Sequence, residues 1–218
     1  HTRLVRDWSS DVCSSDLELR ASLEPLRELL ESRPEDSEVL YLYGAALSGT
    51  GSFTQAVWPL RRAMEDAEWH DRAAIHLANV AVTTGDWDMA TGILDPLVDE
   101  DPDNSEALLL RAYARTHSRQ DYEGALADSD AVLELEPESS DARGLRGVAL
   151  LGLRRIEEAG EAIEQASEHF ETAGMGLADS PRFCVVRATF AKEKAELEKA
   201  EEIFEGCLEE YPTVFLVV

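Results

Sequence analysis

The residues best suited to chemistry are few and widely spaced. Apart from His1, the histidines are scattered, at His70, His76, His117 and His169. No two of them form an i, i+4 histidine pair with a carboxylate partner, so the spacing predicts no zinc site. The sequence also lacks the motifs of phosphate loops, dinucleotide folds, zinc proteases and serine hydrolases. We therefore predict a protein that is not an enzyme and has no catalytic, cofactor-binding or metal-binding residues.

Acidic residues are abundant, but their spacing indicates solvated helix faces. The chain has 45 acidic and 20 basic residues, a formal net charge of −25. This charge disfavours nucleic acid and anionic lipid, and it favours a protein or peptide partner with basic flanks. No apolar stretch is long enough to predict a membrane-spanning segment. Two predicted helices each carry five of these acidic residues, at Glu157, Glu158, Glu161, Glu164 and Glu168, and at Glu198, Glu201, Glu202, Glu205 and Glu209.

The three cysteines give neither a disulfide framework nor a metal-binding spacing. Cys13 lies near the start of the chain, and Cys184 and Cys207 are far from it and from each other. We interpret Cys184 and Cys207 as small buried residues.

The first seventeen residues differ in character from the rest. Residues 1–17 read HTRLVRDWSSDVCSSDL and show neither helical nor strand periodicity. Residues 7–17, DWSSDVCSSDL, resemble the translation of a sequencing-library adapter. We therefore treat residues 1–17 as adapter-derived and expect them to be disordered or docked without specific packing, Trp8 included. The native N-terminus is then missing, which leaves cytoplasmic and bacterial periplasmic locations both open.

One pattern recurs along the chain: a small residue, a large apolar residue four positions later, and a small or apolar residue three beyond. In one copy these residues are Ala56, Leu60 and Ala63. Such positions share one face of a helix. The starting residues are Ser22, Ala56, Ala90, Ala125, Ala159 and Ala200, at intervals of 34, 34, 35, 34 and 41 residues. This period indicates a repeated structural unit.

A second helical pattern precedes each of these segments from Ala56 onward. The first copies are Leu40, Tyr43, Gly44 and Leu47, and then Ala74, Leu77, Ala78 and Ala81. Together the two patterns resemble the tetratricopeptide repeat, W-x2-L-G-x2-Y followed by A-x3-F and then P. The departures are Arg111, Arg146 and Arg187 at the usual Leu, and Ser129 at the usual aromatic position. The resemblance covers residues 18–218 and implies an all-α, right-handed superhelical solenoid of antiparallel helix pairs.

We expect about five complete helix pairs after a leading lone helix. The predicted boundaries are a helix at 18–33, repeats at 37–70, 71–104, 105–139, 140–173 and 181–212, and a truncated helix at 213–218. An insertion at 171–180 is interpreted as a tolerated loop, with a partner-contacting loop as the alternative. We expect the chain to be cut from a longer array, and its apolar TVFLVV end to self-associate or fray.

Caps and small residues support the predicted pairs. Gly51-Ser52 and Gly85-Asp86 mark turns between helices, and Ser52 with Gln55 fits a capping box. Small residues at the repeat positions let two helices approach closely. Ala90 is one of them and is expected to be almost fully buried.

The resemblance implies a peptide-binding groove lined by the first helix of each pair. The residues mapped to it are Tyr41, Ile75, Asn79, Val82, Leu109, Tyr113 and Val148. Their apolar members could instead form the core between repeats. Relatives that clamp a C-terminal carboxylate use Lys, Asn and Arg on this face, and only Asn79 matches, so no such clamp is predicted.

Three functions fit the sequence. The favoured one is a protein-interaction scaffold that binds a peptide or helix of its partner without catalysis. The second is the accessory repeat domain of a longer enzyme, and the third is an envelope-anchored structural protein. Everything visible in the sequence is repeat, which ranks the scaffold first.

Overall fold

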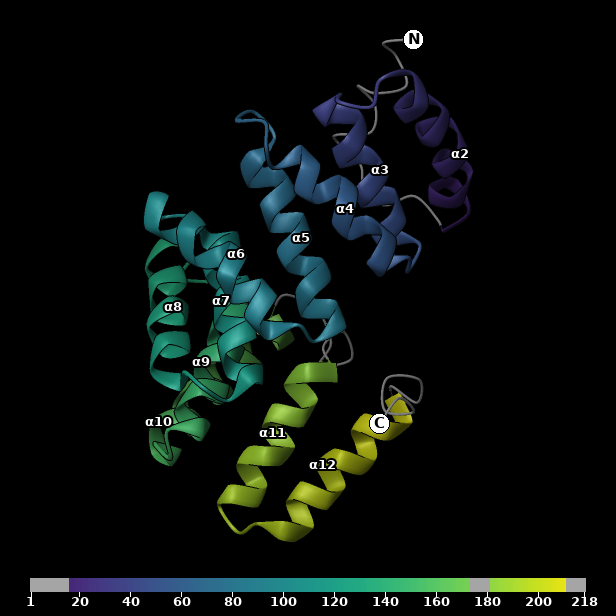
Figure 1. Cartoon of the computed structure of the whole chain (residues 1–218). Coiled ribbons are helices and arrows are strands. Elements are labelled where there is room, and N and C mark those ends of the chain that lie inside the picture. Colours follow the sequence, from purple (N-terminus) through teal and green to yellow (C-terminus); the bar gives the residue numbers. More distant parts are fainter. Residues whose placement is uncertain (1–15, 173–180, 211–218) are drawn as a thin grey trace. The chain divides into compact units, whose positions relative to one another are not determined.

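The computed structural model describes residues 16–172 and 181–210. These residues form eleven α-helices and no strand, which confirms the predicted all-α fold (Figure 1). The expectations for Trp8, for most of the insertion and for the TVFLVV end lie outside the described residues. The helix α2 begins at Asp16, within the adapter-like segment.

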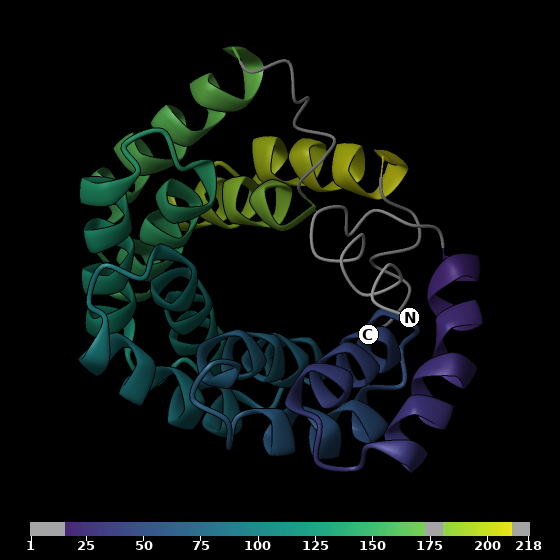
Figure 2. The ribbon, with the colours of Figure 1, turned by 90° about the horizontal axis from the view of Figure 1, so that it is seen from above.

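The chain divides into two compact units, His1–Ile93 and Leu94–Val218, with the boundary inside α6. In the first unit, α3 and α4 form an antiparallel pair, α2 packs on α3, and α5 packs on α4. Seen from above, α2 is the purple helix at the edge of this unit (Figure 2). The helices are α2 (Asp16–Ser32), α3 (Ser37–Gly49), α4 (Phe53–Ala63), α5 (His70–Thr84) and the first part of α6 (Trp87–Glu100).

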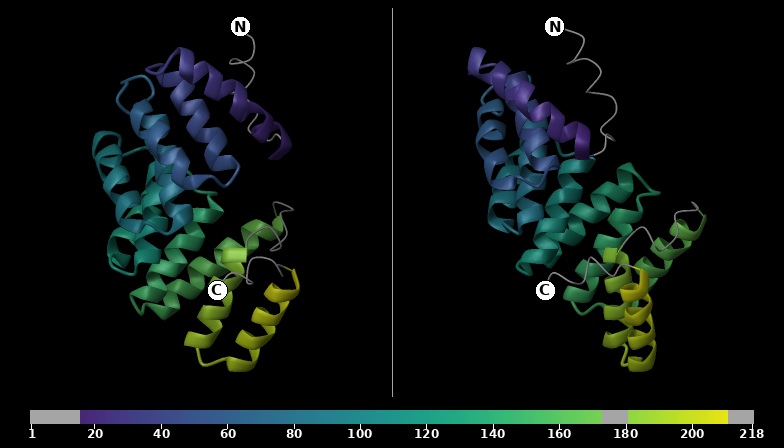
Figure 3. Two further views of the ribbon diagram at one scale, coloured as in Figure 1. Left: turned by 45° about the vertical axis from the view of Figure 1, so that its right-hand side comes forward. Right: turned by 90° about the vertical axis from the view of Figure 1, so that its right-hand side faces the viewer.

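The second unit continues the alternation of first and second helices. Its helices after α6 are α7 (Ser105–Ser118), α8 (Tyr122–Leu135), α9 (Ser140–Gly152), α10 (Ile156–Thr172), α11 (Pro181–Glu193) and α12 (Leu197–Glu210). The pairs α7/α8, α9/α10 and α11/α12 have extensive contacts, and α8 also packs on α9. The last pair is the yellow-green hairpin in both views of Figure 3.

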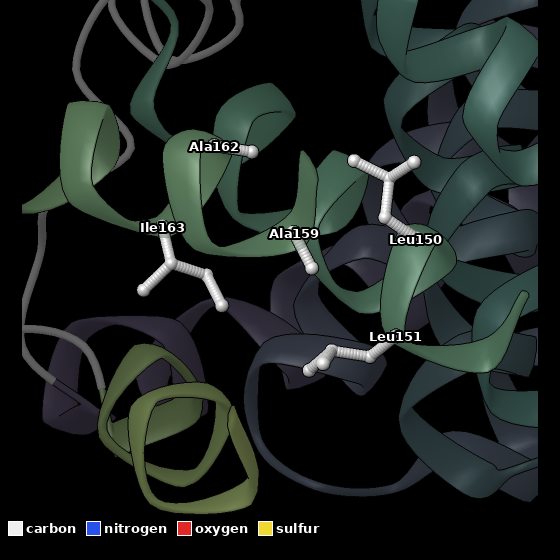
Figure 4. Close-up of a cluster of buried hydrophobic side chains, with 5 residues drawn as sticks. All are labelled: Leu150, Leu151, Ala159, Ala162 and Ile163. Carbon is white, nitrogen blue, oxygen red and sulfur yellow. The ribbon is translucent and has the colours of Figure 1, made fainter. Parts of the chain in front are cut away.

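The two helices of a pair come closest where one of them has a glycine, as in α3/α4 and α9/α10. A Cβ on Gly44 would lie 2.6 Å from Cγ of Leu60, and one on Gly147 would lie 2.9 Å from Cγ1 of Ile163. Ile163 belongs to a buried cluster of α9 and α10 side chains shown in Figure 4. The two helices of a pair can therefore approach closely only because these positions lack a side chain.

Side-chain caps begin several helices. The side chains of Asp36, Asn104, Asp121 and Ser139 each accept a hydrogen bond from the backbone N–H three residues on. Ser52 occupies the same position before α4 but makes no such bond, so the predicted capping box is wrong. Its ψ of 49° is less extended than the 107° of Asp36, and the backbone N–H of Gln55 donates to the Ser52 carbonyl at 3.0 Å instead of to its side chain.

Cys207 departs from the sequence-based interpretation in one respect. It is buried on α12, as predicted, but it is also disulfide-bonded. The side chains of Cys13 and Cys184 lie outside the described part of the chain. Cys207 is therefore more than a small packing residue.

Ala90 on α6 is fully buried, as predicted. Replacing it by Leu adds volume to a packed site, so Ala90→Leu should lower the free energy of unfolding by about 1–3 kcal/mol. Gly92, two residues along the same helix, is an internal control because a Cβ there would meet nothing within 4 Å. Gly92→Ala should raise the free energy of unfolding by about 0.5–1 kcal/mol. Urea unfolding of both variants tests this, and an unchanged Ala90→Leu protein would contradict the packing.

Candidate partner-binding surface

The first helices of the first unit bring aromatic side chains together. The Tyr41 ring on α3 lies 5.2 Å from the Trp69 ring, which precedes α5, and meets the His76 ring edge-on at 5.8 Å. The Arg72 guanidinium lies 5.7 Å from the centre of the Trp69 ring, within cation–π distance. We call Tyr41, Trp69, Arg72 and His76 the Tyr41 cluster. It joins two successive first helices through half-exposed rings.

His76 is the most buried titratable group of this cluster. Its Nε2 shares a 2.7 Å hydrogen bond with the hydroxyl of Ser48 on α3. Burial lowers the pKa of the His76 imidazole below its ordinary value of 6.5, because the charged form loses hydration there. His76 therefore favours the neutral state that its Ser48 contact accommodates.

The groove residues predicted in this unit differ in exposure. Tyr41 and Ile75 are half-buried, and Tyr41 also packs against the core cluster of Leu40, Ala63 and Ala73. Asn79 is exposed, whereas Val82 is buried with 8% of its surface exposed. Val82 therefore packs inside, and Asn79 is accessible from solvent. The prediction missed Trp69 and His76, although Trp69 lies one helical turn before Arg72.

The second unit carries the remaining predicted residues. Leu109, Tyr113 and Val148 are half-buried on α7 and α9. The Tyr113 ring stacks on the His117 ring, with 3.9 Å between centroids and 27° between planes. Leu109, Tyr113 and His117 lie four residues apart and so share one face of α7. This face is again aromatic and partly accessible.

A buried ion network is the main feature that the sequence analysis missed. Arg111 donates two hydrogen bonds to Asp128 on α8, at 2.7 and 3.0 Å, and a third to Asp95 on α6 at 3.1 Å. Arg115 binds the same two carboxylates, Asp128 at 2.9 Å and Asp95 at 3.2 Å. The guanidinium of Arg111, which stands where the repeat usually has Leu, therefore has hydrogen-bond partners in its buried position. The missed signal was Asp128, which precedes the small, buried Ser129.

The described residues contain no cluster of His, Cys, Asp or Glu that could hold a metal ion. No helix among them is long and apolar enough to cross a membrane.

Comparisons with known proteins agree with the repeat pattern. A model of the tetratricopeptide repeat matches residues 76–128 and 118–171. Among solved structures, the chain resembles MamA from Desulfovibrio magneticus RS-1, at 20% identity and a TM-score of 0.65, over 71% of this chain and 86% of that one. It also resembles a thermophilic tetratricopeptide repeat protein from Thermus thermophilus, at 18% identity and a TM-score of 0.64, over 81% and 92%. A tetratricopeptide repeat protein from Parabacteroides merdae is similar at 18% identity and a TM-score of 0.63, over 88% of this chain and 86% of that one.

Because the sequence identity to these structures is low, the similarity shows a shared fold only. No curated protein matches the sequence.

Asp128 should be the key residue of the ion network, because its side chain is only 5% exposed and joins two guanidinium groups. Asp128→Ala leaves Arg111 and Arg115 short of a buried partner and should lower the free energy of unfolding by about 3–5 kcal/mol. Asp130 is a matched control two residues away, since it pairs with Arg146 at 2.7 Å but is 48% exposed. Asp130→Ala should cost less than about 1 kcal/mol. Equal losses in the two variants, measured by chemical denaturation, would refute the distinction.

His76 should make stability depend on pH. The pKa of His76 in the folded protein lies below its unfolded value of 6.5. The contribution of neutral His76 to the free energy of unfolding is therefore complete at pH values above 6.5. As the pH falls below 6.5, the unfolded chain takes up a proton that the folded His76 resists, and stability is lost until the folded pKa is passed. NMR titration of the imidazole should give a pKa below 6.5. In thermal melts, His76→Gln should lose less stability on acidification than the unmodified protein, and an identical pH profile would contradict this assignment.

Proposed function

We propose that this chain, which contains tetratricopeptide repeats, is a non-catalytic scaffold that binds a peptide or helix of a partner protein on its first helices. The observation that carries the proposal is the contrast between the two kinds of helix. First helices present the Tyr41 cluster, Asn79 and the Tyr113–His117 stack. Second helices such as α10 and α12 present rows of exposed carboxylates.

The exposed and half-exposed residues of the first helices suit a peptide. Aromatic rings bury a large apolar area at low entropic cost, and Tyr and Trp each add a polar atom. The Asn79 side chain carries both a donor and an acceptor, so it can bond the backbone of an extended peptide. Each unit offers such a surface on its own helices.

The charge of the chain favours partners with basic residues beside an apolar anchor. A net charge of −25 speeds the approach of basic partners, and salt screens this attraction. Binding on the first helices should therefore weaken as ionic strength rises.

The test is a peptide selected from a display library against the full chain, with affinities measured by calorimetry. Asn79→Ala combined with Tyr113→Ala should weaken binding by about tenfold or more, as loss of interface anchors does. The melting curve should stay nearly unchanged, because Asn79 is exposed and Tyr113 is half-exposed.

Glu161→Ala on the exposed side of α10 serves as the control and should leave affinity within about twofold. If the double variant unfolds, these residues belong to the core. If it binds the selected peptide as well as the unmodified protein does, the first helices are not the binding surface.

A further inference from the structure

A groove on the first unit lies away from the Tyr41 cluster, between two second helices. The helices α2 and α4 both pack on α3 but do not pack closely on each other, so α3 forms the floor between them. The groove has a volume of about 530 Å³. Its apolar lining residues are Leu30, Pro34, Tyr43, Leu47 and Trp58, and its polar ones are Arg27, Glu31 and Gln55.

Trp58 is the unusual residue of this groove. Its side chain on α4 is 55% exposed, so the fold gains little from its size. The repeats provide an internal comparison, because Trp58 lies two residues after Ala56. The equivalent positions of the other repeats hold only small or acidic residues, namely Glu24, Gly92, Ala127, Glu161 and Glu202. A large exposed ring where the repeat tolerates Gly or Glu indicates a contact that lies outside the repeat itself.

Helix α2 forms one side of the groove, and its charged lining residues there are Glu31 and Arg27. Glu24 and Glu28 are also exposed on α2, and Arg27 binds Glu24 at 2.6 Å. Three carboxylates against one guanidinium make this stretch of the helix acidic. An occupant with basic side chains along this edge would be attracted, whereas a second copy of this chain, with its net charge of −25, would be repelled.

We propose that this groove is a second interaction surface that takes a basic amphipathic helix of a partner protein. A slot between two helices with a third as its floor fits a helix, which lays its apolar residues into the slot at i, i+3, i+4 and i+7. Its bulky side chains would rest on Trp58 and Leu47, and its Lys or Arg residues would face Glu28 and Glu31. Trp58 is the anchor because buried Trp dominates such contacts.

The probe is a peptide of about 18 residues, built from Leu on one helical face and Lys on the other. It is titrated into the full chain labelled with 5-fluorotryptophan. The Trp58 fluorine resonance, assigned from Trp58→Phe, should shift on binding, whereas that of Trp69 should not. By calorimetry, Trp58→Ala should weaken binding by about tenfold or more. Glu28→Gln with Glu31→Gln should weaken it too and reduce its dependence on salt.

Leu197→Ala is the matched control, because Leu197 is also a large exposed apolar residue, 66% accessible, on α12. It should change affinity by less than about twofold. Three results would overturn the proposal. They are unchanged binding by Trp58→Ala, equal binding of a peptide with Glu in place of Lys, and a Trp58-dependent dimer in sedimentation without peptide.

Discussion

The close approach of two helices at positions without a side chain is the constraint on which the fold depends. Gly44 lets α3 meet Leu60 of α4, and Gly147 lets α9 meet Ile163 of α10. Leu60 is fully buried and Ile163 nearly so, and each belongs to the apolar core between its helices. A side chain at either glycine would push the pair apart and expose that core. The spacing of these small residues therefore fixes which helix faces are buried and which remain for other uses.

In the second unit, the α7/α8 pair adds a charged contact where the repeat usually packs apolar residues. Arg111 stands where the repeat usually has Leu, and Asp128 lies beside Ser129, where an aromatic residue is usual. The long guanidinium reaches across to the carboxylate, while Ser129 bonds its own helix at the Ala125 carbonyl. Each departure is thus satisfied by its own partner, Arg111 by Asp128 and Ser129 by the Ala125 carbonyl. Breaking a buried ion pair by removing one partner is costly because it leaves the other charge buried and unpaired.

Burial of one face leaves the two kinds of helix free to carry different surfaces. First helices hold rings that contact one another across successive repeats, as Tyr41 contacts Trp69 and His76. Second helices such as α10 and α12 carry rows of exposed carboxylates, whereas α4 carries none and exposes Trp58. The proposed functions use these differences, since an apolar anchor needs a neutral surface and a basic flank needs an acidic one.

The sequence by itself determined the helix pairs, because a 34-residue period of small and apolar residues admits only repeated packing of neighbouring helices. It also identified Ala90 as a buried position. Tertiary structure decided which side chains meet. The Arg111–Asp128 pair is seventeen residues apart in sequence, and Tyr41 and His76 lie on separate helices, so no local pattern joins them. Val82 and Asn79 share one helix but differ in exposure, because neighbouring helices cover one and leave the other in solvent.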